Sequence, residues 1–167
     1  MTTTAHFSEI LSREAADTME KLAFVFAVVG DERIGFDDGS AVAVKVRFAG
    51  PFGGVLLMLV SSGILQELAA NMLGVDEDKA IEDSQRHDAL KETLNVICGN
   101  LLPAIAGRQA VFNIDAPEMV IPAVEPDEDH WGTPTAVARL GLDQGSCDLF
   151  LYVAGDLPEN LPGNAGQ

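Results

Sequence analysis

Apolar residues recur at helical spacing in three parts of the chain, and each part predicts an amphipathic helix. The first covers residues 7–28, where charged side chains fall largely on the opposite side, and Gly30 is expected to end it. The second, residues 63–72, is short, and the third covers about 83–106. The apolar face of the first helix consists of Phe7, Leu11, Ala15, Met19, Leu22 and Phe26.

The second and third helices have recognisable start and stop signals. The hydroxyl groups of Ser61 and Ser62 can cap the start of the second helix. Glycine favours the backbone conformation that ends helices, so Gly74 and Gly107 are expected to close these two segments. Because Pro103 lacks the amide donor of a helix interior, we expect it to kink the third helix or restrict its last turn.

Two segments before the second helix have the patterns of β-strands. Residues 42–48 alternate between apolar and polar side chains, which is typical of a strand with one buried face. Residues 55–60 are continuously apolar, as in a central strand, and the glycine-rich turn 50–54 between the two segments predicts a hairpin. Residues 34–39, which precede them, have the composition of a turn.

The last third of the chain predicts further strands. Residues 135–142 and 147–153 are expected to be two closing strands joined by a turn at 143–146. Shorter apolar runs occupy residues 110–114 and 119–121. The order helix, hairpin, helix, helix and antiparallel strands predicts an α+β fold of two layers, with long helices packed on a mostly antiparallel sheet.

The length and composition fit one domain. The chain has 167 residues, 47% of them hydrophobic, which is ample for a single core, and no repeat or linker divides it. We expect this domain to cover residues 1–154. Residues 155–167 contain proline and several glycine and asparagine residues, so we expect them to form a flexible tail.

The charge excludes several classes of partner. The formal net charge is −16, and no cluster of lysine or arginine offsets it locally. Such a chain repels a phosphate backbone, so nucleic acid and anionic membrane surfaces are not expected partners. The N-terminal residues lack a basic region followed by an apolar run, and the most apolar segment, residues 53–60, is too short to span a bilayer. We therefore expect a cytoplasmic protein.

Residues for metal binding or nucleophilic catalysis are sparse. Cys98 and Cys147 have no metal-ligand spacing and are expected to be buried, small apolar residues. The acidic connector, residues 76–83, lacks the glycine and glutamate that a calcium loop requires. The acidic run 125–131 and the polar residues within 14–17 are both interpreted as solvated surface. No metal site and no cofactor of its own is predicted.

The third predicted helix carries an unusual polar stripe. At about 100° per residue, Asp88, Glu92 and Asn95 project within an arc of ~60°, and Gly99 extends the stripe and leaves room for another molecule. The apolar residues of this helix fall on the opposite side, so the stripe should face solvent. These apolar residues are Leu90, Leu94, Ile97, Leu101 and Ile105.

The residues alone leave two interpretations of this stripe open. Glutamate and asparagine on an exposed helix face are usually only solubilising residues. Asparagine is, however, a mediocre helix former, so Asn95 lowers the stability of the middle of the helix. A residue that lowers local stability indicates a role other than helix formation. A carboxamide both donates and accepts hydrogen bonds, so it can hold a water molecule in a chosen direction.

The stripe and its surroundings resemble the signature of the CheC/CheX/FliY phosphatases of bacterial chemotaxis. The motif reads Asp88-x3-Glu92-x2-Asn95, followed by Gly99-Asn100 and later by Pro117. The resemblance covers roughly residues 7–154. Because the chain has a single full motif, it is more similar to CheX than to CheC, which usually carries two.

The resemblance implies a protein phosphatase that removes the phosphoryl group from the aspartyl phosphate of a CheY-like response regulator. It assigns to Asn95 the orientation of the attacking water and to Glu92 the anchoring of the partner, with Asp88 and Gly99 contributing to partner binding. The Mg²⁺ would belong to the partner receiver domain. The resemblance also implies a homodimer formed through sheet edges. The alternative is a non-enzymatic receiver-binding module of the same fold, comparable to the FliM middle domain.

Overall fold

A computed structural model describes residues 3–30, 41–120, 132–143, 145–155, 157–158 and 161–162. Within these ranges the helices are α1 (Thr3–Ala23), α2 (Leu65–Leu73) and α3 (Asp83–Ala106), and a short 3-10 turn, Ser62–Ile64, leads into α2. The predicted bounds of the third helix are confirmed.

The strands form one antiparallel sheet. Its order is β1-β6-β7-β3-β2-β4, with β5 also paired to β2, and all of these pairings are antiparallel. The strands are β1 (Ala27–Val29), β2 (Ala41–Ala49), β3 (Gly53–Ser61), β4 (Asn113–Ile114), β5 (Glu118–Val120), β6 (Ala136–Leu142) and β7 (Gly145–Ala154). The predicted α+β fold with a mostly antiparallel sheet is confirmed.

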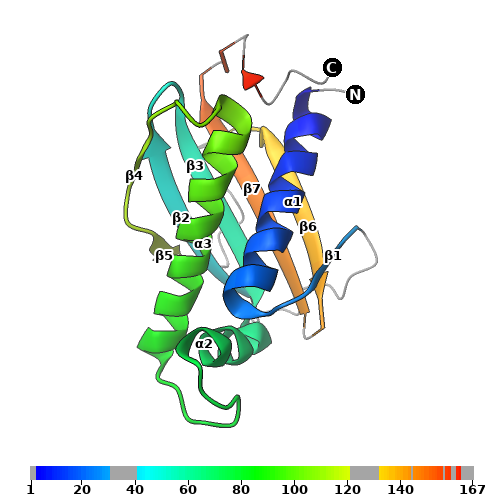
Figure 1. Cartoon of the computed structure of the whole chain (residues 1–167), viewed down its shortest axis with the longest axis vertical. Helices are drawn as coiled ribbons and strands as arrows, with labels where there is room; N and C mark the ends of the chain where they lie inside the picture. The colour runs from blue at the N-terminus through cyan, green and yellow to red at the C-terminus, as the bar shows by residue number, and fades with distance from the viewer. Residues whose placement is uncertain are drawn as a thin grey trace.

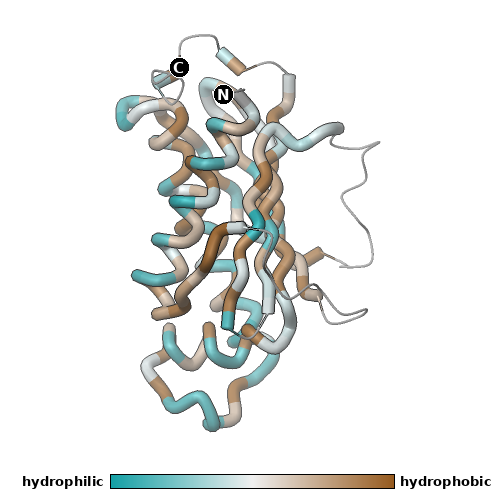
Figure 2. The backbone as a smooth tube through the Cα atoms, turned by 90° about the vertical axis from the view of Figure 1, so that its right-hand side faces the viewer, coloured by the Kyte–Doolittle hydropathy of each residue, from teal (hydrophilic) through white to brown (hydrophobic). Residues whose placement is uncertain are grey.

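The helices and the sheet form two layers. α1 and α3 contact each other and lie along one face of the sheet, α1 against β6 and α3 against β2, while α2 lies across the lower end of the pair (Figure 1). The view turned by 90° shows the helical layer beside the sheet (Figure 2). The main core fills the space between the layers, and its largest fully buried side chains are Phe7, Leu11, Met19, Leu56, Met58, Ile64, Leu68, Leu90, Leu94, Ile97, Leu101 and Leu102.

The predicted hairpin is present, and its second strand lies in the middle of the sheet. β2 and β3 pair from Ala41 opposite Ser61 to Phe48 opposite Gly54, and β3 pairs with β7 on its other side. Alternate residues of β3 face opposite sides of the sheet. Leu56 therefore packs in the main core, while Leu57 joins a small cluster on the other side. Burial on both faces explains why this strand is continuously apolar.

The first helix is shorter than the periodicity predicts. It ends at Ala23, and Phe24 follows in the left-handed region with a φ of 56°. The next residues leave the helix and form β1, which pairs with β6 from Ala27 opposite Leu142. Phe26, expected on the buried helix face, is 66% exposed. The prediction was wrong because aromatic and branched residues after Ala23 suit an edge strand, and β6 offers them backbone partners.

Two residues that were predicted to mark helix ends have other roles in the structure. Gly30 does not end a helix; it follows β1 and donates its amide to the carbonyl of Arg139. Ser61 does not cap α2, because its hydroxyl accepts the amide of Ser146 at 2.9 Å and thereby links β3 to β7. The N-cap of α2 is Ile64, without a side-chain cap.

The predicted ends of α2 and α3 are confirmed at Gly74 and Gly107. Gly74 adopts a left-handed conformation with a φ of 70°. The α3 helix continues through Pro103 to Ala106, and the amide of Gly107 donates to the carbonyl of Pro103. The missing amide of proline falls near the helix end, where the helix continues for one further turn only.

Some predictions fall outside the described residues. These are the turn 34–39, the acidic run 125–131, and part of the tail 155–167. Within the described part of that tail, Leu161 is buried against the main core. The division into a domain of residues 1–154 and a flexible tail stays a prediction. No helix in the described ranges combines the length and apolar character needed to cross a membrane.

We predict that Gly54→Ala destabilises the fold. A Cβ atom at Gly54 would lie 2.0 Å from the carbonyl oxygen of Tyr152, which belongs to the neighbouring β7 strand. The strands would have to separate locally, so the free energy of unfolding should fall by about 2–3 kcal/mol in urea titrations. Gly53→Ala is the matched control, because its Cβ would meet nothing closer than 3.4 Å. Equal stability of the two variants would contradict the prediction.

Candidate functional site

The α3 helix presents the predicted polar stripe outward. Asp88, Glu92 and Gly99 are exposed, and Asn95 is half-buried. The five apolar residues predicted on the opposite side are all buried: Leu90, Leu94, Ile97, Leu101 and Ile105. The orientation of the stripe toward solvent is therefore confirmed. The roles of its residues are not established by their exposure.

The first turn of α3 is fixed by a network of hydrogen bonds. Glu82 and Gln85 form a capping box, in which each side chain bonds to the backbone of the other residue. The guanidinium of Arg86 donates to the carbonyl of Ile81 at 2.6 Å and to Oε1 of Gln66 at 3.1 Å, and it also pairs with Asp83. The helix therefore begins in a defined position relative to α2, one turn before Asp88.

The same network holds the acidic connector. The Gln66 side-chain amide donates to the backbone carbonyls of Glu77 at 2.8 Å and Lys79 at 2.7 Å. Two connector carbonyls are thus bound by a side chain of α2. The connector consequently serves as a structured link between α2 and α3.

The turn that carries Glu92 and Asn95 is held from its buried side. Thr93 is fully buried, and its hydroxyl donates to the carbonyl of Ala89 at 2.8 Å. The same oxygen lies 3.5 Å from the sulfur of Met72 on α2. The stripe thus stands on a helix turn that is packed and hydrogen-bonded beneath it.

Gly99 leaves a bare patch of backbone on the stripe. A Cβ atom built at this position would meet no atom within 4 Å. Nothing in the described part of the chain therefore requires glycine here, although glycine in a helix interior costs about 0.5–1 kcal/mol relative to alanine.

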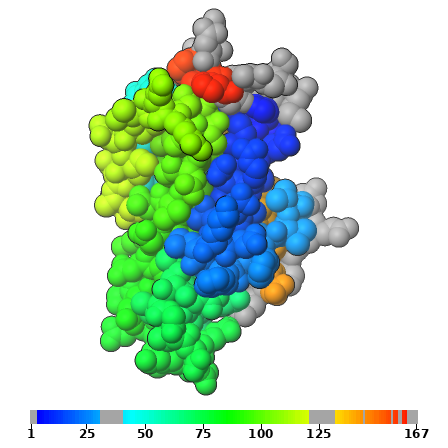
Figure 3. Space-filling model, in the orientation of Figure 1, coloured from blue at the N-terminus to red at the C-terminus, as the bar shows by residue number. Residues whose placement is uncertain are grey.

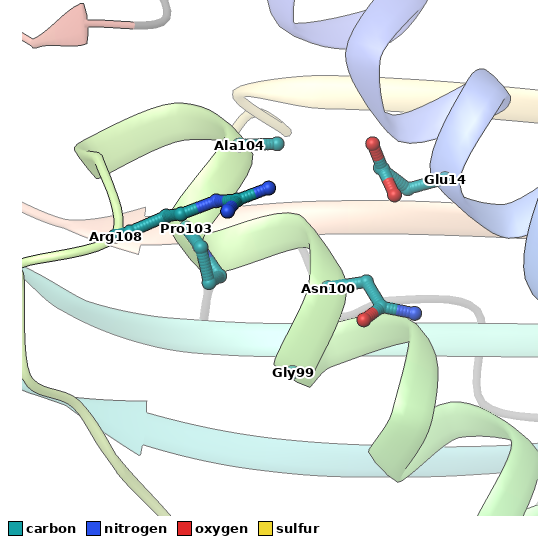
Figure 4. A pocket seen from close by; sticks show the side chains of 6 residues that line it. All are labelled: Glu14, Gly99, Asn100, Pro103, Ala104 and Arg108. Atoms are coloured by element: carbon teal, nitrogen blue, oxygen red, sulfur yellow. The ribbon is translucent and has the colours of Figure 1, made fainter.

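A hollow of about 440 Å³ lies beside the stripe, between α3 and α1 (Figure 4). Glu14 of α1 and Arg108 reach toward it from opposite sides. A second hollow of about 340 Å³ continues along the helix pair and shares Glu14 and Asn100 with the first. The first hollow is lined by Glu14, Gly99, Asn100, Pro103, Ala104 and Arg108.

Asn100 connects the two helices at this point. Its side-chain amide donates to the hydroxyl of Thr18 on α1 at 3.2 Å. In the space-filling view α1 and α3 meet along the front of the molecule (Figure 3). The hollows are therefore part of the junction between the two helices.

The structure assigns no nucleophilic role to the cysteines. Cys98 and Cys147 are buried and unbridged, as the sequence predicts. Burial raises the pKa of the Cys98 thiol to about 12, and burial together with neighbouring Asp148 also raises the pKa of Cys147. Both thiols are therefore protonated near neutral pH, whereas the thiolate is the nucleophilic form. In the described ranges, no three histidine, cysteine or acidic side chains gather in a potential metal site.

The structure places four of the predicted residues on one face of α3 and Pro117 on a separate segment. Asp88, Glu92, Asn95 and Gly99 share one exposed stripe. Pro117 lies between β4 and β5, both of which contact α3.

Sequence reasoning missed Glu14 and Arg108. Glu14, interpreted as solvated surface, lines both hollows and is only 21% exposed in its side chain. Its position three residues after buried Leu11 and four before Thr18 placed it at the border of the apolar face. This border position was the sequence feature that could have indicated a partly buried Glu14. No sequence pattern pointed to Arg108.

Comparison with known proteins shows similarity to one family. The sequence matches the family model described as chemotaxis phosphatase CheX over residues 42–124, a range that includes the whole stripe. A search of curated proteins finds no match.

Solved structures share the fold over most of the chain. CheX from Vibrio vulnificus has 15% identity, covers 89% of this chain and 96% of its own, and has a TM-score of 0.68. The Borrelia burgdorferi complex of CheX with CheY, BeF3 and magnesium has 16% identity, coverages of 88% and 97%, and a TM-score of 0.61. The FliM middle domain from Vibrio alginolyticus has 16% identity, coverages of 92% and 93%, and a TM-score of 0.51.

At these identities the structural comparison shows the fold, and the family model adds the relationship in sequence. The predicted resemblance to the CheC/CheX/FliY family is thereby confirmed.

Proposed function

From the premise that this chain is related to the CheC/CheX/FliY family, we propose that it hydrolyses the aspartyl phosphate of a CheY-like receiver domain. The observation that carries the proposal is the exposed stripe of α3, where Glu92 stands beside a half-buried asparagine, Asn95, on a firmly packed helix. This arrangement suits a surface that inserts into the active site of another protein.

The proposed reaction needs a positioned water and no nucleophile from the phosphatase. The oxygen of water attacks phosphorus, the bond between phosphorus and the aspartyl oxygen breaks, and inorganic phosphate, free carboxylate and a proton are released. Acyl phosphates are already activated, so positioning the water in line supplies much of the required catalysis. The Asn95 carboxamide orients this water by hydrogen bonding.

Glu92 anchors the partner in this proposal. Its carboxylate lies one helical turn before Asn95 on the same stripe and pairs with the active-site lysine of the receiver. Asp88 extends the contact by a further turn. The Mg²⁺ that neutralises the phosphoryl group belongs to the receiver. The Borrelia relative, solved as a complex of CheX with CheY, BeF3 and magnesium, supports a partner of this kind.

We predict that this protein shortens the lifetime of a phosphorylated receiver from its own organism. Asn95→Ala should lower kcat about a hundredfold while binding is retained, because its role is confined to positioning the water. Glu92→Ala should mainly raise KM, by about tenfold, because its carboxylate pairs with the partner. The measurement is the decay of phosphorylated receiver, followed at several enzyme concentrations.

Asn113→Ala, an exposed asparagine on β4, is the control for the Asn95 variant and should retain wild-type turnover. A wild-type protein that accelerates the decay of no receiver would rule out the phosphatase. Binding without acceleration would favour the alternative, a receiver-binding module comparable to the FliM middle domain, whose fold this chain shares.

We predict that Gly99→Ala has opposite effects on stability and turnover. The added methyl group meets no atom of the described residues within 4 Å, so the free energy of unfolding should rise by about 0.5–1 kcal/mol. The same group would obstruct a partner backbone that approaches the stripe closely, so KM should rise about tenfold.

Gly107→Ala is the control for this variant, because Gly107 has a φ of 91° and Pro162 lies 3.2 Å from its would-be Cβ. It should lower stability and leave the stripe unobstructed. Unchanged KM in Gly99→Ala would refute close contact at this position.

We also infer a homodimer formed through β1, as the family resemblance implies. β1 ends the strand order, and its Val28 and Val29 are 70% and 56% exposed. An apolar edge strand is a template for pairing with another strand.

We predict that Val29→Lys shifts the sedimentation coefficient from that of two chains to that of one. Lysine on an edge strand opposes pairing between sheets. Val111→Lys, beside β4 and also at a highly exposed valine, is the control and should leave the dimer intact. A monomeric wild type at all concentrations would contradict the inference.

A further inference from the structure

The groove between α1 and α3 is continuous with the proposed active stripe. Gly99 belongs to both, since it extends the stripe and lines the larger hollow. Glu14 and Asn100 line both hollows, so they lie where the two hollows join. A protein that docks on the stripe therefore also meets this groove.

Glu14 and Asn100, which both hollows share, supply acceptor oxygens, while the cationic side chains of the lining are Arg108 in the first hollow and Lys21 in the second. The Asn100 amide nitrogen donates one of its two N–H groups to Thr18, and its carbonyl oxygen can accept a hydrogen bond from a ligand. The Glu14 carboxylate contributes two further acceptor oxygens. These side chains come from different helices and face the same hollow (Figure 4).

The charge of Glu14 is only weakly compensated within the described structure. The ion pair recorded there joins Glu14 to its neighbour Arg13, at 3.5 Å, with 58% of the arginine side chain exposed. A single exposed pair of this kind contributes little. The carboxylate itself is largely shielded by the helices, where a cation that displaced water would bind more strongly than on an open surface.

We propose that this groove is a second docking site for the receiver, which inserts a lysine or arginine side chain between the Glu14 carboxylate and the Asn100 carboxamide oxygen. The inference rests on the proposed function and deepens it by naming a contact away from the reacting phosphoryl group. Both acceptors favour a cation with several N–H donors.

Arg108 fixes the direction in which the receiver docks. Its guanidinium approaches the hollow from the side opposite Glu14 (Figure 4). It repels a basic side chain placed at that end and attracts an acidic one. The groove therefore selects a receiver whose basic residue meets Glu14 and whose acidic residue meets Arg108.

This contact provides discrimination that the stripe cannot supply. Glu92 and Asn95 contact the active site around the aspartyl phosphate, which every phosphorylated receiver has. A choice between receivers therefore requires contacts at surfaces that differ between them. Glu14 is accordingly a specificity residue, remote from the reacting atoms.

The test compares binding and turnover in variants of Glu14. The probe is the cognate receiver with beryllofluoride and Mg²⁺ at its phosphorylation site, which allows the dissociation constant to be measured without hydrolysis. Glu14→Gln should raise Kd about tenfold and flatten the dependence of Kd on salt. Glu14→Asp, which keeps the charge on a shorter side chain, should give an intermediate Kd. In the decay assay KM should rise and kcat should stay near the wild-type value.

Glu9→Gln is the matched control, because Glu9 is an exposed residue of α1 that lines neither hollow. It removes the same charge and should leave Kd within about twofold of wild type. Thermal unfolding of each variant verifies that α1 remains folded.

If Glu14→Gln and Glu9→Gln have the same Kd, the proposed docking site is wrong. The proposed phosphatase activity is not affected by that result. A fall in kcat at unchanged Kd would also overturn the docking site, because Glu14 would then act on catalysis. A wild-type protein that neither binds nor dephosphorylates any receiver would overturn both proposals.

Discussion

The apolar face of α3 is buried in the main core, and the arrangement of the rest of the molecule depends on this contact. Leu90, Leu94 and Ile97 are almost completely removed from water, and each such side chain contributes about 1.5–3 kcal/mol of transfer free energy. A helix cannot rotate about its axis without losing this burial. The opposite face, with Glu92 and Asn95, is consequently held toward solvent in a fixed direction.

The sheet provides the platform for this helix. β3 is buried on both faces between β2 and β7, so it forms the rigid centre against which the helical layer packs. Contacts of Arg86 with Gln66, of Thr93 with the sulfur of Met72 and of Asn100 with Thr18 then attach α3 to α2 and α1 at its start, middle and later part. A helix fixed at three levels can insert into another protein with little loss of conformational entropy.

In the proposed function the site on this chain is incomplete by itself, because the phosphoryl group and the Mg²⁺ would belong to the partner. The chain supplies a carboxylate, a carboxamide and a shaped surface, and its buried cysteines are protonated. In this proposal, recognition and catalysis share one face of the molecule. The strong negative charge makes local contacts with basic groups of the partner the natural means of attraction.

The sequence by itself determined the helix α3, the β2–β3 hairpin, the antiparallel character of the sheet and the outward direction of the stripe, because periodicity alone decides which residues can be buried together. It failed after Ala23, where pairing with β6 overrode helical spacing, and at Ser61, whose hydroxyl bonds to β7 instead of capping a helix. Only the tertiary structure placed Glu14 beside Asn100 in a shared groove. These residues are far apart in the chain, and their proximity follows from packing of α1 against α3, which no local pattern encodes.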